Sequence, residues 1–155
     1  MISPELLRRF PFFARLNAAQ LKTLAMLADE IYLEAGHVLF EENQPADTLY
    51  LLVEGEVDLY YISEDKLRSK ARKEFLVGEI NPEEIFGISA IIEPNIYTST
   101  CRAANKSRLI KFDSRALREK MDQDCSLGYV LAQQAARAAL QRLNYTRVQL
   151  AAAWA

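Results

Sequence analysis

The sequence predicts a mainly β protein, an antiparallel double-stranded β-helix or jelly roll with N-terminal helices and a long C-terminal helix. Short β-rich runs recur between residues 31 and 112 at nearly even spacing, with turn residues between them. Both ends of the chain instead show helical periodicity. We therefore expect one domain over residues 1–155, made of a helical arm (1–30), a β-roll (31–112) and C-terminal helices (113–155).

The N-terminal arm carries start signals for two helices. Ser3 can cap the first, with Pro4 at its first helical position, and Pro11 ends it. The second begins with an Asn-x-x-Gln variant of the capping box, from Asn17 to Gln20. Three aromatic residues lie between the two helices, and we expect them to fasten the arm onto the core: Phe10, Phe12 and Phe13.

The central region alternates β-rich runs with turn signals rich in Gly, Asn and Pro. The predicted strands are 31–33, 38–40, 49–53, 57–61, 75–80, 97–103 and 108–112. The polar segment 63–73 is predicted to be a long hairpin tip. A basic run of this kind is typical of a solvated face, and the role of Lys66, Arg68, Lys70, Arg72 and Lys73 stays open.

The C-terminal third is predicted to be helical. A short helix opens at Asp113, and a long Ala-rich helix without proline runs from about 126 to 154. One stripe of this helix alternates spacings of four and three, which is typical of a coiled-coil seam. We expect a homodimer through Leu140, Leu143, Arg147, Leu150 and Trp154, which follow Ala136 in this stripe. The helix could also lie on its own β-roll, and both arrangements are compatible.

Composition excludes several classes of protein. No apolar run approaches the ~20 residues of a membrane span, and no secretory signal is present. The net charge of -2 argues against a nucleic-acid binder. His37 is the single histidine, and no cluster has metal-ligand spacing, so we expect neither an enzyme nor a metal cofactor. Cys101 and Cys125 are predicted to be free thiols in a cytoplasmic protein.

The ordered series of glycines and strands resembles the cyclic-nucleotide-binding domain of the catabolite activator (Crp/Fnr) superfamily. The segment 36–57 follows that family's order of glycine, strand, turn, Asp-x-x-Tyr, strand and Gly-x-Val. Asn43 stands where the family usually has glycine, and Asn tolerates the left-handed conformation next best. The segment 81–87 resembles the approach to the phosphate-binding cassette, and Arg142-Leu143 with Thr146 resembles the end of the family's long helix.

The resemblance implies a regulatory or sensor module without catalytic activity. Transcription factors of that superfamily append a winged helix-turn-helix after this helix, whereas this sequence stops at Trp154-Ala155. We therefore expect no direct contact with nucleic acid. A small ligand or a protein partner is expected to act through the long helix. The alternative is a dimeric scaffold without ligand that serves a partner protein.

The cassette departs from the family pattern, in which a glutamate contacts the ribose and an arginine pairs with the cyclic phosphate. Alignment on Gly87 and Ala103 puts Ile88 at the glutamate position and Tyr97 at the arginine position. Tyr cannot supply the charged fork of Arg, and loss of such a pair costs about 2–5 kcal/mol at a desolvated site. We expect weak or no binding of cAMP or cGMP, and no cofactor.

Seven residues are candidates for the degenerate ligand pocket: Gly87, Ile88, Ser89, Tyr97, Thr98, Arg102 and Thr146. Arg102 reaches the pocket only if its strand turns it inward, and otherwise is an exposed strand residue. Thr146 either contacts the ligand or lies on the helix surface. The pocket itself is predicted to be filled by its own side chains, with an uncharged, apolar ligand as the alternative.

Overall fold

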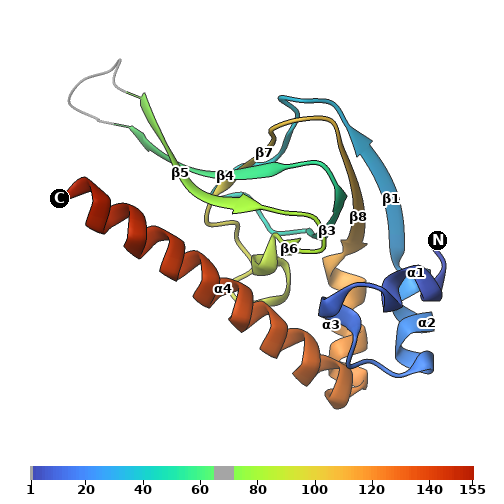
Figure 1. Cartoon of the computed structure of the whole chain (residues 1–155). Helices are drawn as coiled ribbons and strands as arrows, with labels where there is room; N and C mark the ends of the chain where they lie inside the picture. The colour runs from blue at the N-terminus through green and yellow to red at the C-terminus, as the bar shows by residue number, and fades with distance from the viewer. Residues whose placement is uncertain (1, 65–71) are drawn as a thin grey trace.

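Two four-stranded antiparallel sheets face each other, and helices pack at one end and along one side of them (Figure 1). This computed structural model describes residues 2–64 and 72–155. The strand orders are β1-β8-β3-β6 in one sheet and β2-β7-β4-β5 in the other. Apart from β4 and β5, consecutive strands do not pair with each other, as in a jelly roll. The predicted fold class is confirmed.

The elements have the following bounds. The first sheet contains β1 (Ala28–Leu33), β8 (Ser107–Asp113), β3 (Thr48–Glu54) and β6 (Ile85–Phe86). The second contains β2 (Val38–Phe40), β7 (Thr100–Ala103), β4 (Val57–Glu64) and β5 (Arg72–Ile80). The helices are α1 (Pro4–Arg8), η1 (Pro11–Phe13), α2 (Ala18–Met26), η2 (Ile88–Ile91), α3 (Ser114–Gln123) and α4 (Cys125–Ala153).

The N-terminal arm is held as its cap signals predict. The Ser3 side chain accepts a hydrogen bond from the N–H of Glu5, and Asn17 and Gln20 form a complete capping box. Phe13 is buried and lies 5.6 Å, centroid to centroid, from the ring of Phe112 on β8. The aromatic residues of the arm therefore join it to the core of the roll.

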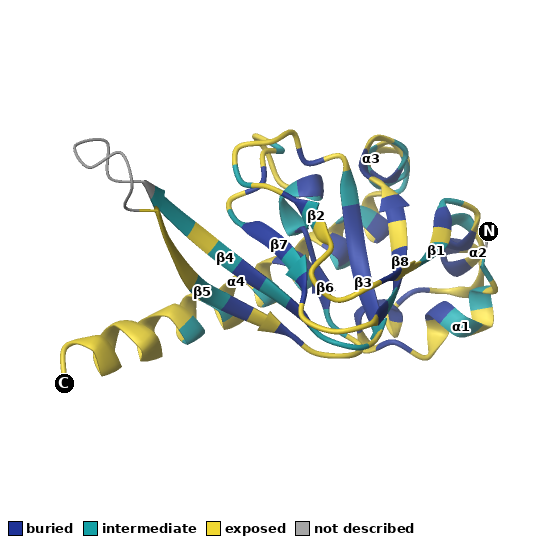
Figure 2. Ribbon diagram, turned by 90° about the horizontal axis from the view of Figure 1, so that it is seen from above, coloured by how far each residue is buried: buried dark blue, intermediate teal, exposed yellow. Residues whose placement is uncertain are grey.

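The core lies between the two sheets, where β3 is the most continuously buried strand (Figure 2). Its residues 49–52 are all buried, which explains why this run shows little polar alternation. The turn before it places Asn43 at a φ of 69°, so the left-handed conformation expected at this position is confirmed.

Several boundaries differ from the sequence prediction. β1 begins at Ala28, inside the predicted helical arm (1–30), because α2 ends at Met26 and Ala28 pairs with Phe112 on β8. The predicted strand 97–103 contains only β7, because the backbone of Tyr97 bonds to the loop at 43–44 instead of a neighbouring strand. β6 pairs with β3 and has two residues, which is too short for any periodicity to predict. The hairpin tip is shorter than expected, since Ser63, Arg72 and Lys73 pair within β4 and β5; Lys66, Arg68 and Lys70 lie outside the described residues.

Helix α4 has two halves with different surroundings. Its first half packs against the protein through buried Leu127, Leu131 and Ala135. Its distal half extends past the roll on the same side as the β4–β5 hairpin (Figures 1 and 2). The large side chains there are exposed: Leu140, Leu143, Val148, Leu150 and Trp154. None of the helices in the described part is long and apolar enough to cross a membrane.

Substitution of two glycines by alanine distinguishes the cost of a left-handed backbone from the cost of a steric clash. Gly55 and Gly36 both have positive φ, at 104° and 88°. A Cβ at Gly55 would collide with Ser107 Oγ and lie 2.7 Å from Lys106 O, whereas one at Gly36 meets nothing within 4 Å. Gly36→Ala should lower the free energy of unfolding by about 1–2 kcal/mol, and Gly55→Ala by at least about 1 kcal/mol more. Urea denaturation of both variants measures the difference, and equal losses would contradict a clash at Gly55.

Candidate functional site

Tyr97, which the sequence predicts at the arginine position of the cassette, has a buried side chain with 3% of its surface exposed. Its hydroxyl donates to the backbone oxygen of Thr48 at 2.6 Å and accepts from the N–H of the same residue at 3.1 Å. Burial raises the pKa of Tyr97 well above its usual value, so the side chain stays neutral. Tyr97 therefore offers no charge to an anion, and both hydrogen-bonding functions of its hydroxyl are already used.

Four aromatic rings stack in series beside this hydroxyl. The ring of Tyr97 lies 3.8 Å from that of Phe40, with 11° between the planes. Phe40 in turn stacks on Tyr50, and Tyr50 stacks on Phe86 at 5.1 Å. Stacked rings bury large areas in a fixed geometry. The series joins β2 and β3 to β6, and it holds Tyr97 in place from one side.

The cassette turn begins at Gly87, whose φ of 71° is left-handed. A Cβ there would lie 3.1 Å from Thr48 O and 3.3 Å from the ring of Tyr50, so glycine suits both the conformation and the space. Helix η2 follows directly. The Asn95 amide then donates to three backbone oxygens, of Ser89, Ala90 and Ile92, and so closes the loop 87–95 on itself.

A cavity of about 340 Å³ lies between this loop and α4, so the prediction that the pocket is filled by its own side chains is wrong. Five of the predicted site residues line it together: Gly87, Ile88, Ser89, Tyr97 and Thr98. Most of the added wall is apolar, from Phe40, Leu59, Ile92, Pro94, Ile96 and Ala139, with polar contributions from Glu93, Ser99 and Arg142. We name this space the cassette cavity. Its walls suit apolar surface better than a sugar and a phosphate.

Arg102 and Thr146 do not line the cassette cavity. Cys101 and Ala103 on β7 are buried, and alternation turns Arg102 between them to the outer face. There its guanidinium pairs with Glu74 at 3.0 Å and lies 4.7 Å from the centre of the Tyr60 ring. The Thr146 hydroxyl donates to Arg142 O on the exposed surface of α4. Arg102 is therefore a strand residue on the outer face of the sheet, and Thr146 is a residue of the helix surface.

Arg142 is a residue that the candidate set omitted, although it belongs to the Arg-Leu pair on the long helix. Its Nη2 donates to the backbone oxygen of Ile85 at 2.9 Å, while its Nε is buried without a partner. Burial lowers the pKa of Arg142. Arg142 lies seven residues, or about two helical turns, after the buried Ala135. It therefore lies on the face of α4 that packs against the roll, and this spacing could have identified it from the sequence.

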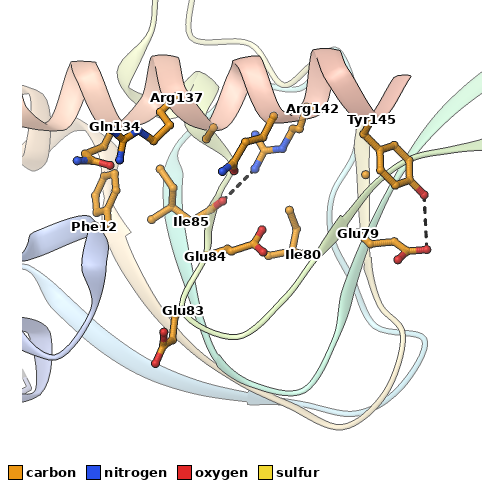
Figure 3. A pocket seen from close by; sticks show the side chains of 13 residues that line it. Phe12, Glu79, Ile80, Glu83, Glu84, Ile85, Gln134, Arg137, Arg142 and Tyr145 are labelled. Carbon is orange, nitrogen blue, oxygen red and sulfur yellow. Dashed lines mark hydrogen bonds between the residues drawn. The ribbon is translucent and has the colours of Figure 1, made fainter. Parts of the chain in front are cut away.

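A second cavity of about 340 Å³ lies on the other side of Arg142, between α4 and the β5–β6 connection (Figure 3). We name it the helix cavity. Its sheet wall carries Glu79, Glu83 and Glu84, and its helix wall carries Arg137 and Tyr145. The Tyr145 hydroxyl donates to Glu79 at 3.5 Å (Figure 3). This space is more acidic than the cassette cavity.

Groups for covalent or metal chemistry are sparse. Among the described residues, no cluster of three or more His, Cys, Asp or Glu side chains could hold a metal ion. Cys101 is buried in the core, and burial raises the pKa of its thiol, which disfavours the nucleophilic thiolate. His37 is exposed at the turn before β2.

Known proteins resemble this chain along most of its length. The family "Cyclic nucleotide-binding domain" matches residues 30–124. A solved structure from Geobacter metallireducens GS-15, named for cyclic nucleotide binding, is 40% identical, with a TM-score of 0.80 over 92% of this chain and 99% of the other. The N-terminal domain of a Streptomyces coelicolor A3(2) transcriptional regulator is 28% identical, with a TM-score of 0.67 over 88% and 93%.

A curated relative places the match within a longer protein. The CRP-like cAMP-activated global transcriptional regulator of Mycobacterium tuberculosis is 26% identical over 114 residues, which are 74% of this chain and 48% of the regulator. The chain therefore spans less than half the length of the curated relatives that it matches.

Tyr97→Phe tests how strongly the hydroxyl bonds hold the cassette. The change removes the Tyr97 hydroxyl from the backbone N–H and C=O of Thr48 in a partly buried place, so the free energy of unfolding should fall by about 1–3 kcal/mol. Tyr61→Phe is the control, since this ring is half exposed and its change should stay within about 0.5 kcal/mol. Urea denaturation measures both. Equal effects in the two variants would contradict a structural role for the Tyr97 hydroxyl.

Proposed function

The chain belongs to the cyclic nucleotide-binding domain family, and on this premise we propose that it is a non-enzymatic regulatory module whose altered cassette does not bind cAMP or cGMP tightly. The module is one domain, residues 1–155, in which the roll holds the cassette and α4 carries its state outward. The regulators among its relatives support the class of function. The cassette geometry supports the altered specificity.

The observation that carries this proposal is that the Tyr97 hydroxyl is hydrogen-bonded to the backbone of Thr48. A cyclic phosphate that leaves water needs a cation or several free donors in return. Tyr97 is neutral, and its one donor is spent on Thr48 O at 2.6 Å. Ile88 adds to the effect, because an aliphatic side chain cannot accept the hydrogen bond of a ribose hydroxyl. The module therefore lacks two of the polar contacts that a cyclic nucleotide requires.

The affinity for cyclic nucleotides tests this directly. We expect titration calorimetry with cAMP and with cGMP to give dissociation constants well above about ten micromolar. The double variant Ile88→Glu with Tyr97→Arg should gain measurable affinity for cAMP, because it restores the carboxylate and the cation of the family pattern. Tight binding by the unaltered protein would overturn the proposal. A double variant that folds but gains nothing would mean that the cavity shape, and not its charge, excludes the nucleotide.

The exposed distal half of α4 favours a second element of the function, a homodimer through this helix. Leu140 and Leu150 are 65% and 58% exposed, and Trp154 is 84% exposed. Apolar surface of this kind along one stripe is typical of an interface. Arg147, also in the stripe, would fix the register of the pair at some cost in stability. A dimeric scaffold for a partner protein, without ligand, is the alternative that this surface supports.

Sedimentation velocity tests the helix pairing. Leu143→Glu puts a charge into the proposed seam, so we expect a dimer in the unaltered protein and a monomer in the variant at micromolar concentration. Val148→Glu is the matched control, because Val148 is also exposed on α4 but lies off the stripe. A monomeric unaltered protein, or a dimer that survives Leu143→Glu, would contradict pairing through this stripe.

A further inference from the structure

Arg142 carries a half-buried positive charge, which Glu84 in the wall of the helix cavity stabilises from a distance. Among the described residues it forms no ion pair, and its Nε is one of two buried side-chain polar atoms that lack a hydrogen-bond partner. The other is Asp58 Oδ1, and Asp58 lines neither cavity. A buried cation is stabilised strongly by an anion that reaches it. Arg142 therefore offers a charged donor to an anion in either of the two cavities that it lines.

The two cavities that meet at Arg142 differ in how they would receive an anion. The helix cavity places Glu79, Glu83 and Glu84 along its sheet wall, and these carboxylates repel negative charge (Figure 3). The cassette cavity has one acidic residue, Glu93, which is exposed to solvent as Glu79 and Glu83 are, so the cavities differ in the number of carboxylates and in the half-buried Glu84. The electrostatics favour the cassette cavity.

The remaining walls of the cassette cavity define the rest of the ligand. They are mostly aliphatic and aromatic, from Phe40, Leu59, Ile88, Ile92 and Ile96. Hydroxyls occur at Ser89, Thr98 and Ser99. The volume of about 340 Å³ lies at the lower end of the range for small-molecule sites. An apolar body with a single small anionic group matches these walls better than a polar sugar does.

We propose that the cassette cavity binds an amphipathic monoanion, an apolar molecule that carries one carboxylate. The carboxylate bonds to Arg142, and the apolar part packs against Ile88, Ile92 and Ile96. This inference rests on the proposed regulatory role and specifies its ligand class. Arg142 lies on α4 between the helix's packed half and its exposed half. A carboxylate that bonds to Arg142 would thus tie the occupied cavity directly to the position of α4.

Matched pairs of ligands test the charge requirement on the full chain. The probes are decanoate with 1-decanol, and 1-naphthaleneacetate with its amide, each titrated by calorimetry. We expect at least one carboxylate to bind about 10- to 100-fold more tightly than its neutral partner, the gain typical of a charge-assisted hydrogen bond. Binding of none of the probes, or equal binding within both pairs, would overturn the inference.

Variants assign the charge preference to a residue. Arg142→Gln removes the charge and keeps a polar side chain, and it should abolish the preference for carboxylate. Arg137→Gln is the matched control, because Arg137 is an arginine on α4 that lines the helix cavity alone, and it should retain the preference. A preference that survives Arg142→Gln would contradict the assignment. Circular dichroism and melting temperature establish that each variant is folded.

Two further variants distinguish the cavities and do not depend on Arg142→Gln being stable. Ile88→Glu adds a carboxylate to the cassette wall, where it competes for Arg142, and should abolish the preference. Glu83→Gln removes a negative charge from the helix cavity and should leave binding unchanged. Tighter binding in Glu83→Gln would place the anion in the helix cavity and overturn the inference. The cyclic-nucleotide titrations are separate, so tight cAMP binding would refute the proposed function by its own measurement.

Discussion

The two hydrogen bonds between the Tyr97 hydroxyl and the backbone of Thr48 tie the cassette to the central sheet. Thr48 is the first residue of β3, the strand that forms the middle of the core. Tyr97 reaches it across the site, and Phe40 covers the ring. Gly87 also lies against Thr48, and because it has no Cβ it leaves room for Thr48 O and the Tyr50 ring. The shape of the cassette turn thus depends on one neutral side chain where the family pattern has a charged one.

This exchange has an electrostatic consequence at the other wall of the site. A cassette that keeps the family pattern offers a cation and a carboxylate, whereas this one presents Tyr97 and Ile88. The positive charge at the cassette cavity belongs to Arg142 on α4, which donates one hydrogen bond to Ile85 O. The positive charge at this cavity is therefore carried by the helix and not by the loop. A ligand that uses this charge would contact α4 more strongly than the loop.

Helix α4 can serve as the output because its two halves have different partners. Leu127, Leu131 and Ala135 anchor the first half in the core. The distal half extends beside the β4–β5 hairpin and leaves its apolar stripe uncovered. Arg142 lies where one environment changes to the other. A ligand bound to Arg142 would contact α4 close to the point where the helix leaves the roll. A small tilt of the helix at this point would displace its C-terminal end by a large distance.

Local sequence determined the fold class and much of the detail that depends on near neighbours. The caps at Ser3 and Asn17, the left-handed Asn43 and the long helix follow from short-range backbone chemistry, so residue type and spacing suffice. The sequence also brought Gly87, Ile88, Ser89, Tyr97 and Thr98 to one site, because they belong to one loop.

Tertiary structure decided what depends on direction and on contacts between distant segments. Arg102 faces outward because of its register on β7, and β6 exists only through its pairing with β3. The partners of Tyr97 and Arg142 lie 49 and 57 residues away in the chain, so no local pattern announces them. Whether a buried group is paired or left unpaired depends on the whole packing around it, and the unpaired Nε of Arg142 is visible only once the chain is folded.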